Sequence, residues 1–147
     1  MKISTKTRYG VRAMVDLALH AGTKPVLVKE IARRQRVSER YLEHLMLAMK
    51  KAGFIRSQVG AKGGYFLARD PARITVREIV EVFEGSLAPV DCAHAASSCP
   101  RSAVCATREV WCSVRDTLAR LLDATTVASL VRRHQEKEAG SAAMYEI

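Results

Sequence analysis

The sequence predicts a mainly α-helical fold with a small β-wing: a winged helix-turn-helix followed by a long helix. Apolar residues recur at helical spacing in several segments, and two β-rich runs flank the glycine-rich stretch GAKGG. Residues 1–83 carry 17 Lys and Arg against 7 Asp and Glu, whereas residues 84–147 carry 7 against 8. A basic half joined to a neutral half indicates a polyanionic partner for the first half.

The first part of the chain predicts three helices. Ser4 can cap a first helix that ends near Gly22. A short second helix is expected at about 28–35. After a tight connection, Ser38 caps a third helix, and Gly53 ends it.

A β-hairpin is expected next. Phe54–Val59 and Tyr65–Ala68 are rich in β-forming residues, and the glycines between them favour a turn with Lys62 at its tip. Glycine removes side-chain bulk, so such a tip can approach a nucleic-acid backbone closely.

The second part of the chain predicts three more helices. A capping-box pattern opens a helix over 75–85, and a loop follows over 86–100. A long helix is expected from about 101 to 123, with a short one at about 126–135. The polar remainder, 136–147, is predicted to be a flexible tail.

This order of elements is typical of a winged helix-turn-helix, whose second motif helix enters the major groove of double-stranded DNA. The N-terminal part of the third helix would meet base edges there. Candidate residues on it are Ser38, Glu39, Arg40, Tyr41, Glu43 and His44. Candidate phosphate contacts elsewhere are Lys2, Lys6, Arg8, Arg12, Arg33, Arg34, Arg56 and Lys62. Tyr41 has packing on the helix as an equally weighted alternative.

All four cysteines lie within VDCAHAASSCPRSAVCATREVWC, at Cys92, Cys99, Cys105 and Cys112. Structural zinc sites usually contain cysteine pairs two to four residues apart, and this segment has none. Wide spacing on a loop favours a larger unit, an iron–sulfur cluster held by thiolates. Cys105 is expected within the first turns of the long helix. Cys112 is the weaker candidate, because it lies seven positions later on that helix, about 10.5 Å further along the axis.

Several stretches resemble one known family. They are KISTKTRYGVRAMVDLAL, IARRQRVSERYLEHLM, MKKAGFIRS, GAKGGYFLARDPARITVREIVEVFEG and the trio Cys92, Cys99 and Cys105 followed by Trp111. Over about residues 1–135 the chain resembles the IscR- and NsrR-like winged-helix transcription regulators of the Rrf type. The resemblance implies a homodimeric bacterial regulator whose trio of cysteines holds a 2Fe–2S or 4Fe–4S cluster. Such a cluster reports redox state, nitric oxide or cluster supply.

On this resemblance the chain divides into four parts. They are a DNA-binding domain (1–85), a cluster-binding loop (86–105), dimerisation helices (101–135) and the tail. The sequence also departs from the family pattern. Arg108 stands where one branch has a histidine ligand, Arg8 where another has an aspartate, and Val59 where the wing usually has an arginine. The fourth ligand could then be Cys112, a partner-subunit group, a small molecule or nothing, while Asp91 and His94 are nearby non-thiol options.

Three other functions stay open. The protein could be a thiol-switch regulator without a cluster, a zinc-held regulator, or a protein-interaction module controlled by a partner enzyme. An enzyme is not expected, because no nucleophile–base arrangement or phosphate-binding glycine loop stands out. No apolar run approaches the 18 or so residues of a membrane span, and the N-terminus lacks a signal-peptide pattern. We therefore expect a cytoplasmic location.

Overall fold

Three helices pack around one apolar core in the computed structural model, which describes residues 2–145. They are α1 (Thr5–Leu19), α2 (Val28–Gln35) and α3 (Glu39–Lys51). Their inward faces supply Met14, Leu17, Ile31, Leu42 and Met46, all essentially without exposed surface. This trihelical unit, which we call the head together with the hairpin, has the helix order that the sequence predicts.

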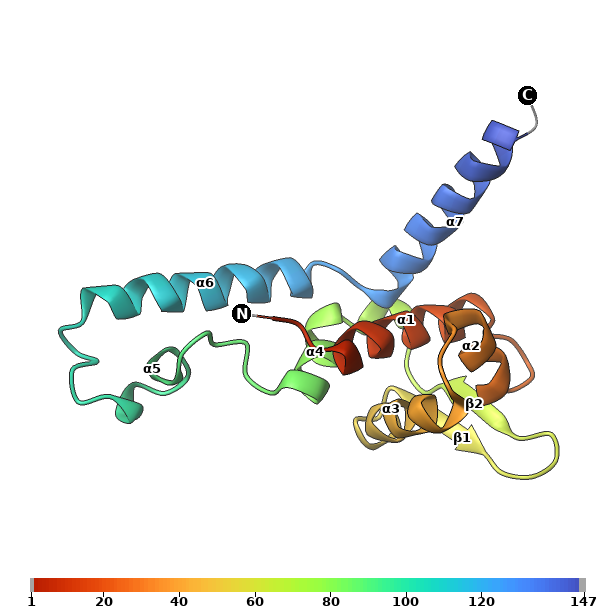
Figure 1. The fold of residues 1–147 in the computed structure, drawn as a ribbon, viewed down its shortest axis with the longest axis horizontal. Helices are drawn as coiled ribbons and strands as arrows, with labels where there is room; N and C mark the ends of the chain where they lie inside the picture. The colour runs from red at the N-terminus through yellow and green to blue at the C-terminus, as the bar shows by residue number, and fades with distance from the viewer. Residues whose placement is uncertain (1, 146–147) are drawn as a thin grey trace.

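The predicted hairpin is present as two short antiparallel strands, β1 (Ile55–Gln58) and β2 (Gly64–Leu67). Ile55 lies opposite Leu67, and Gln58 lies opposite Gly64. Backbone hydrogen bonds in both directions between Val26 and Tyr65 fasten the hairpin to the segment before α2. The hairpin projects from the head as a wing (Figure 1).

Helix α4 (Val76–Glu84) connects the head to the rest of the chain. It follows a 3-10 turn (Pro71–Arg73) and begins with the predicted capping box between Thr75 and Glu78. Ile79 packs in the core of the head, whereas Val76 and Val80 pack with Leu87 in a second apolar cluster. One short amphipathic helix therefore contributes to both cores.

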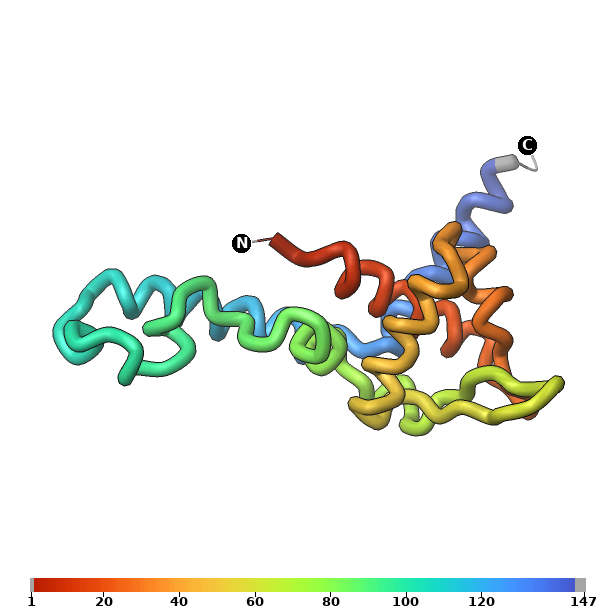
Figure 2. Tube along the Cα trace, turned by 60° about the horizontal axis from the view of Figure 1, so that its bottom comes forward, coloured from red at the N-terminus to blue at the C-terminus, as the bar shows by residue number. Residues whose placement is uncertain are grey.

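Beyond α4 the chain forms an arm that points away from the head (Figures 1 and 2). The arm contains α5 (Asp91–His94), a 3-10 turn (Ala96–Ser98) and the long helix α6 (Ala106–Asp123). Helix α5 packs on the distal part of α6, and α4 packs on the proximal part. Helix α7 (Val127–Tyr145) returns to the head and packs on α1.

Three predicted boundaries are wrong. The expected loop over 86–100 contains a helix and a 3-10 turn. The long helix begins at Ala106 rather than near residue 101, because two successive turns hold 99–104 and Cys105 is extended. The last helix continues to Tyr145, so that the described part of the predicted tail, 136–145, is helical.

The extension of α7 has a local cause. Residues 132–139 are rich in strong helix formers, and the pairs Arg132–Glu136 and His134–Glu138 have the helical i,i+4 spacing. None of the helices within 2–145 combines the length and apolar character that a bilayer crossing requires.

Candidate nucleic-acid interface and cysteine segment

The turn between α2 and α3 sets the angle at which α3 leaves the head. Arg36 takes a left-handed conformation (φ 56°, ψ 47°), and the N–H of Val37 donates to the carbonyl of Ala32 at 3.0 Å. Ser38 then caps α3, because its hydroxyl accepts a hydrogen bond from the Tyr41 N–H at 3.2 Å. The predicted cap is confirmed, and it fixes the start of the helix.

The two faces of α3 differ sharply. Leu42, Leu45, Met46 and Met49 are buried in the core. The opposite face exposes most of the predicted base-contacting residues, namely Ser38, Glu39, Arg40, Glu43 and His44. This exposed face carries hydrogen-bond donors and acceptors at the helix end that meets bases in helix-turn-helix proteins.

Tyr41 departs from this group. Its ring meets that of Tyr9 on α1 edge-on, with centroids 6.0 Å apart, and its hydroxyl is buried without a partner among the described residues. Tyr41 therefore packs α3 against α1 and does not share the exposed face, which supports the packing alternative.

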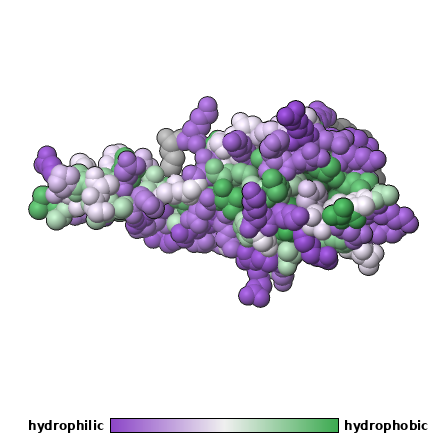
Figure 3. Space-filling view, turned by 90° about the horizontal axis from the view of Figure 1, so that it is seen from below, coloured by the Kyte–Doolittle hydropathy of each residue, from purple (hydrophilic) through white to green (hydrophobic). Residues whose placement is uncertain are grey.

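The wing lies beside α3 and presents cations on the same side of the head. Lys62 is exposed in the turn between the strands, and the Arg56 guanidinium lies 4.3 Å from the centre of the Phe66 ring. Lys50 at the end of α3 donates to the Ser57 hydroxyl at 2.6 Å, which ties the wing to the helix. Viewed from this side, the surface of the head is largely hydrophilic, with apolar patches between the hydrophilic side chains (Figure 3).

Burial raises the pKa of Tyr65 in the wing, and the nearby Glu43 carboxylate raises it further. The charge of Glu43 therefore acts at the junction between α3 and the wing.

Most of the predicted phosphate contacts outside α3 are exposed cations. Lys2, Lys6, Arg8, Arg12 and Arg33 all lie on the surface. Arg34 does not belong with them. Its guanidinium binds both oxygens of the buried Asp16 carboxylate at 2.7–3.0 Å, so we assign it a structural role.

The four cysteines are distributed along the arm, and each is half-buried and free of a disulfide. Cys92 lies in α5, and Cys99 ends the following 3-10 turn. Cys105 is the N-cap of α6, and Cys112 lies two turns into that helix. The expected position of Cys105 within the first turns of the helix is corrected to the residue just before it.

Two arginines of α6 hold residues 92–105, which we call the cysteine segment, against that helix. Arg108 donates its Nε–H to the carbonyl of Cys92 at 2.8 Å, and Arg115 donates to the carbonyl of Ala93. Ala93 is fully buried beneath them. The Arg108 side chain thus holds the cysteine segment by binding a backbone carbonyl.

The hydrogen bonds around Cys105 favour the thiolate form of its side chain. A hydrogen bond with the Thr107 hydroxyl, 3.2 Å from its Sγ, lowers the pKa of the Cys105 thiol, and the Arg108 backbone N–H adds to this effect. The thiolate is the form that binds metals and attacks electrophiles.

The donor chemistry of the segment suits iron, because three free thiols lie within one short stretch. The described arrangement does not gather them: within residues 2–145 no three Cys, His, Asp or Glu side chains are close enough to hold a metal ion. At least one of Cys92, Cys99 and Cys105 would have to move for all three thiols to share one cluster.

The sequence did not predict the residues whose long-range contacts join the helices of the head, α4 and the cysteine segment. Asp16, Arg115 and Glu84 had no local signal, because their partners are distant along the chain. Asp16 binds Arg34 from 18 positions away, and Glu84 accepts the Ser4 N–H from 80 positions away. The acidic residues in apolar helical stretches were the one available hint, since buried acids are paired.

Comparison with known proteins gives one consistent result. Residues 3–133 match the Rrf2 family, described as an iron-dependent transcriptional regulator. The chain is 43% identical to protein rrf2 of Nitratidesulfovibrio vulgaris, over 90% of this chain and 88% of that protein.

Two solved structures share the fold. One is CymR, titled the global cysteine regulator of B. subtilis (TM-score 0.76, 38% identity, 90% of this chain and 98% of that one). The other is T. potens IscR (TM-score 0.75, 42% identity, 93% of this chain and 90% of that one). The predicted mainly helical fold with a β-wing is confirmed by both.

Proposed function

Because the chain belongs to the Rrf2 family of transcriptional regulators, we propose that it binds operator DNA with α3 and the wing and that its cysteine segment controls this binding. The observation that carries the proposal is the polar, cation-rich surface that α3 and the wing share. An α-helix fits the major groove, which is about 12 Å wide, and a glycine-rich wing tip can approach the adjacent backbone.

The residues on this surface divide by role. Arg40, Glu43 and His44 would read base edges, while Ser38 and Glu39 start the helix next to the phosphates. Lys62 and Arg56 on the wing would contact the backbone or minor groove. Further phosphate contacts would come from Lys2, Lys6, Arg8 and Arg33.

We further propose that the protein binds DNA as a homodimer paired through α6. No residue of α6 is fully buried in the single chain, and Trp111, Val110 and Leu121 are 40%, 55% and 64% exposed. A two-fold dimer would cover these side chains and would present two α3 helices to two half-sites.

For the cysteine segment we propose a cluster held by Cys92, Cys99 and Cys105, with Cys112 as a candidate fourth ligand. An iron–sulfur cluster supplies sensitivity to oxidants, nitric oxide and iron supply when it is bound. The chain's own contribution is mechanical: Arg108 and Arg115 dock the segment on α6, and α4 joins the arm to the core of the head.

A second candidate is a thiol switch without a cluster. Two observations favour it: the lowered pKa of Cys105, and the absence of three converging ligands within the described residues. The similarity to a protein titled as a cysteine regulator supports the same alternative. In this case oxidation would join two cysteines of the segment.

The DNA-binding part is tested by selecting duplexes from a random library with the purified protein and measuring affinity across salt concentrations. We expect Lys62→Gln to reduce the slope of log K against log[salt] by about 1, and Arg40→Ala to weaken the selected site by about 1–3 kcal/mol while unselected DNA changes little. Arg132→Gln on α7 is the matched control. A slope near zero would contradict the proposal.

The two candidates for the cysteine segment are separated by chemical analysis. Anaerobically purified protein is assayed for iron and acid-labile sulfide, and for absorption at about 300–450 nm from thiolate-to-iron charge transfer. A colourless, iron-free protein whose cysteines form a disulfide with a mild oxidant would favour the thiol switch and exclude the cluster.

A further inference from the structure

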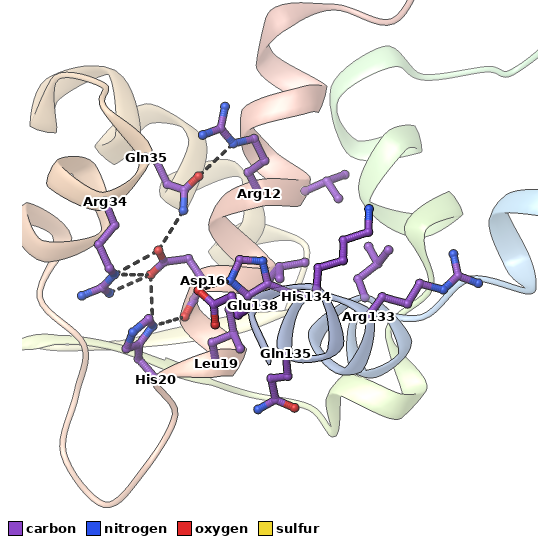
Figure 4. Close-up of a pocket in the computed structure, with 14 residues that line it drawn as sticks. Arg12, Asp16, Leu19, His20, Arg34, Gln35, Arg133, His134, Gln135 and Glu138 are labelled. Carbon is purple, nitrogen blue, oxygen red and sulfur yellow. Dashed lines mark hydrogen bonds and ion pairs between the residues drawn. The ribbon is translucent and has the colours of Figure 1, made fainter. Parts of the chain in front are cut away.

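A cleft of about 940 Å³ lies between α1, the end of α2 and α7, on the head and away from the cysteine segment (Figure 4). Its volume falls in the range of small-molecule sites, roughly 300–1,000 Å³. Apart from Arg12, which is also a predicted phosphate contact, its lining residues belong neither to the surface proposed for DNA nor to the cysteine segment. Its apolar walls are formed by Val11, Val15, Leu19 and Leu130.

The polar side chains at the α1–α2 edge of the cleft are hydrogen-bonded to one another. The Asp16 carboxylate, 3% exposed, receives hydrogen bonds from Arg34 and from the Gln35 side chain at 2.8 Å. Gln35 in turn accepts the Arg12 Nε–H at 2.8 Å, and His20 lies 3.5 Å from Asp16 (Figure 4). Asp16 is therefore occupied by its neighbours and cannot neutralise the remaining cations.

The cations that remain line the cleft from two elements, beside the Glu138 carboxylate, which lies 3.2 Å from the His134 ring nitrogen Nε2. Arg12 on α1 and Arg133 and Lys137 on α7 line it, and within residues 2–145 none of the three has a carboxylate within 4.0 Å. Arg133 and Lys137 are one helical turn apart, a like-charge spacing that destabilises a helix. Arg12 is held in place by Gln35 and by the Tyr9 ring, 4.8 Å away.

We propose that this cleft binds a small anion with two or more acidic groups, a polycarboxylate or a phosphate compound. One acidic group would pair with Arg12 and another with Arg133 and Lys137, while the apolar walls cover the connecting carbons. Binding would relieve the repulsion between the α7 cations. Arg34 and Gln35 are the last two residues of α2, directly before the turn into α3. An anion bound to Arg12, which contacts Gln35, would therefore also influence the position of α3.

The test is isothermal titration calorimetry of the full chain without DNA, with citrate and pyrophosphate as the two probes at constant ionic strength. We expect saturable binding of at least one probe with a Kd below about 1 mM, equivalent to more than about 4 kcal/mol. Citrate alone would identify a polycarboxylate site, and pyrophosphate alone a phosphate site. The double variant Arg133→Gln/Lys137→Gln should weaken binding about tenfold or more, as loss of charge-assisted hydrogen bonds does.

Two controls locate the effect. Arg132→Gln, on the same helix but outside the cleft, should bind as the unaltered protein does, and circular dichroism checks that α7 persists. Arg40→Gln/Lys62→Gln removes the same charge from the α3–wing surface and should leave anion binding intact. Saturation by neither probe would overturn the proposal, as would an equal or greater loss in the Arg40/Lys62 variant.

Discussion

At the scale of single residues, buried acids decide which arginines are available to a partner. Arg33 and Arg34 are adjacent in sequence and carry the same charge, yet only Arg33 is exposed. Arg34 forms a bidentate pair with Asp16, and this pairing raises the pKa of its guanidinium. A count of basic residues therefore overstates the surface that can contact phosphates.

The Glu84 carboxylate should make the stability of the fold depend on pH. This carboxylate accepts hydrogen bonds from Ser4 and Thr7, which lower its pKa below the ordinary value of 4.5. Because the folded pKa is the lower one, this stabilisation is complete above the unfolded pKa and is lost as the pH falls through the folded value. We expect Glu84→Gln to lower the Tm at pH 7.

The diagnostic quantity is the Tm difference between the unaltered protein and Glu84→Gln, measured by circular dichroism from pH 7 to about pH 3. It should shrink as the pH falls below the ordinary value of 4.5. Glu136→Gln, on the exposed side of α7, is the control. A difference that stays constant over this range would show that the charge of Glu84 contributes nothing.

At the scale of elements, the contact between α1 and α4 is the joint between head and arm. Gly10 is buried on α1, and a Cβ there would collide with the Phe83 ring of α4. The absence of a side chain is what lets the two helices approach.

Gly10→Ala should therefore lower the free energy of unfolding by about 1–2 kcal/mol, because overpacking outweighs the better helix propensity of alanine. Denaturant unfolding measures it. Gly140→Ala, where a Cβ meets no atom within 4 Å, is the matched control and should not destabilise. Phe83→Leu in the Gly10→Ala background should recover part of the loss; stability unchanged in Gly10→Ala would refute this account of the joint.

Local signals made most elements of the head predictable. The Ser38 cap and the glycine-rich turn of the wing, and likewise the Thr75–Glu78 capping box that begins α4, each depend on residues within a few positions of one another. Their sequence patterns therefore carry enough information to define the element.

Long-range packing was not predictable in the same way. The apolar side chains of α6 have different environments in the structure: Leu118 packs against α4, while Trp111 and Leu121 remain exposed. The start of α6 is fixed by turns over 99–104, and Arg34 is fixed by an acid on another helix. For the candidate sites, the exposed face of α3 follows from helical periodicity, whereas the docking of the cysteine segment by Arg108 and Arg115 does not.

At the scale of the whole molecule, the arm extends from the head as a structure that is too thin to bury its own apolar side chains (Figure 2). If a second copy covers α6, the double variant Trp111→Glu/Leu121→Glu should be monomeric, because two buried charges would face each other across the two-fold axis. Light scattering after size exclusion measures the mass. Ala139→Glu on α7 should remain dimeric, and a dimeric double variant would remove α6 from the interface.

The central claim is that the cysteine segment controls how the head binds DNA. The most direct measurement compares the Kd of the anaerobically purified protein with that of Cys92→Ser/Cys99→Ser/Cys105→Ser, on the selected duplex at one salt concentration. A coupling of about 1–3 kcal/mol predicts that the two Kd values differ roughly 5- to 150-fold. Equal Kd values would contradict the claim for a protein shown to carry iron; for a protein with an oxidisable thiol pair instead, a Kd that oxidation of that pair leaves unchanged would contradict it.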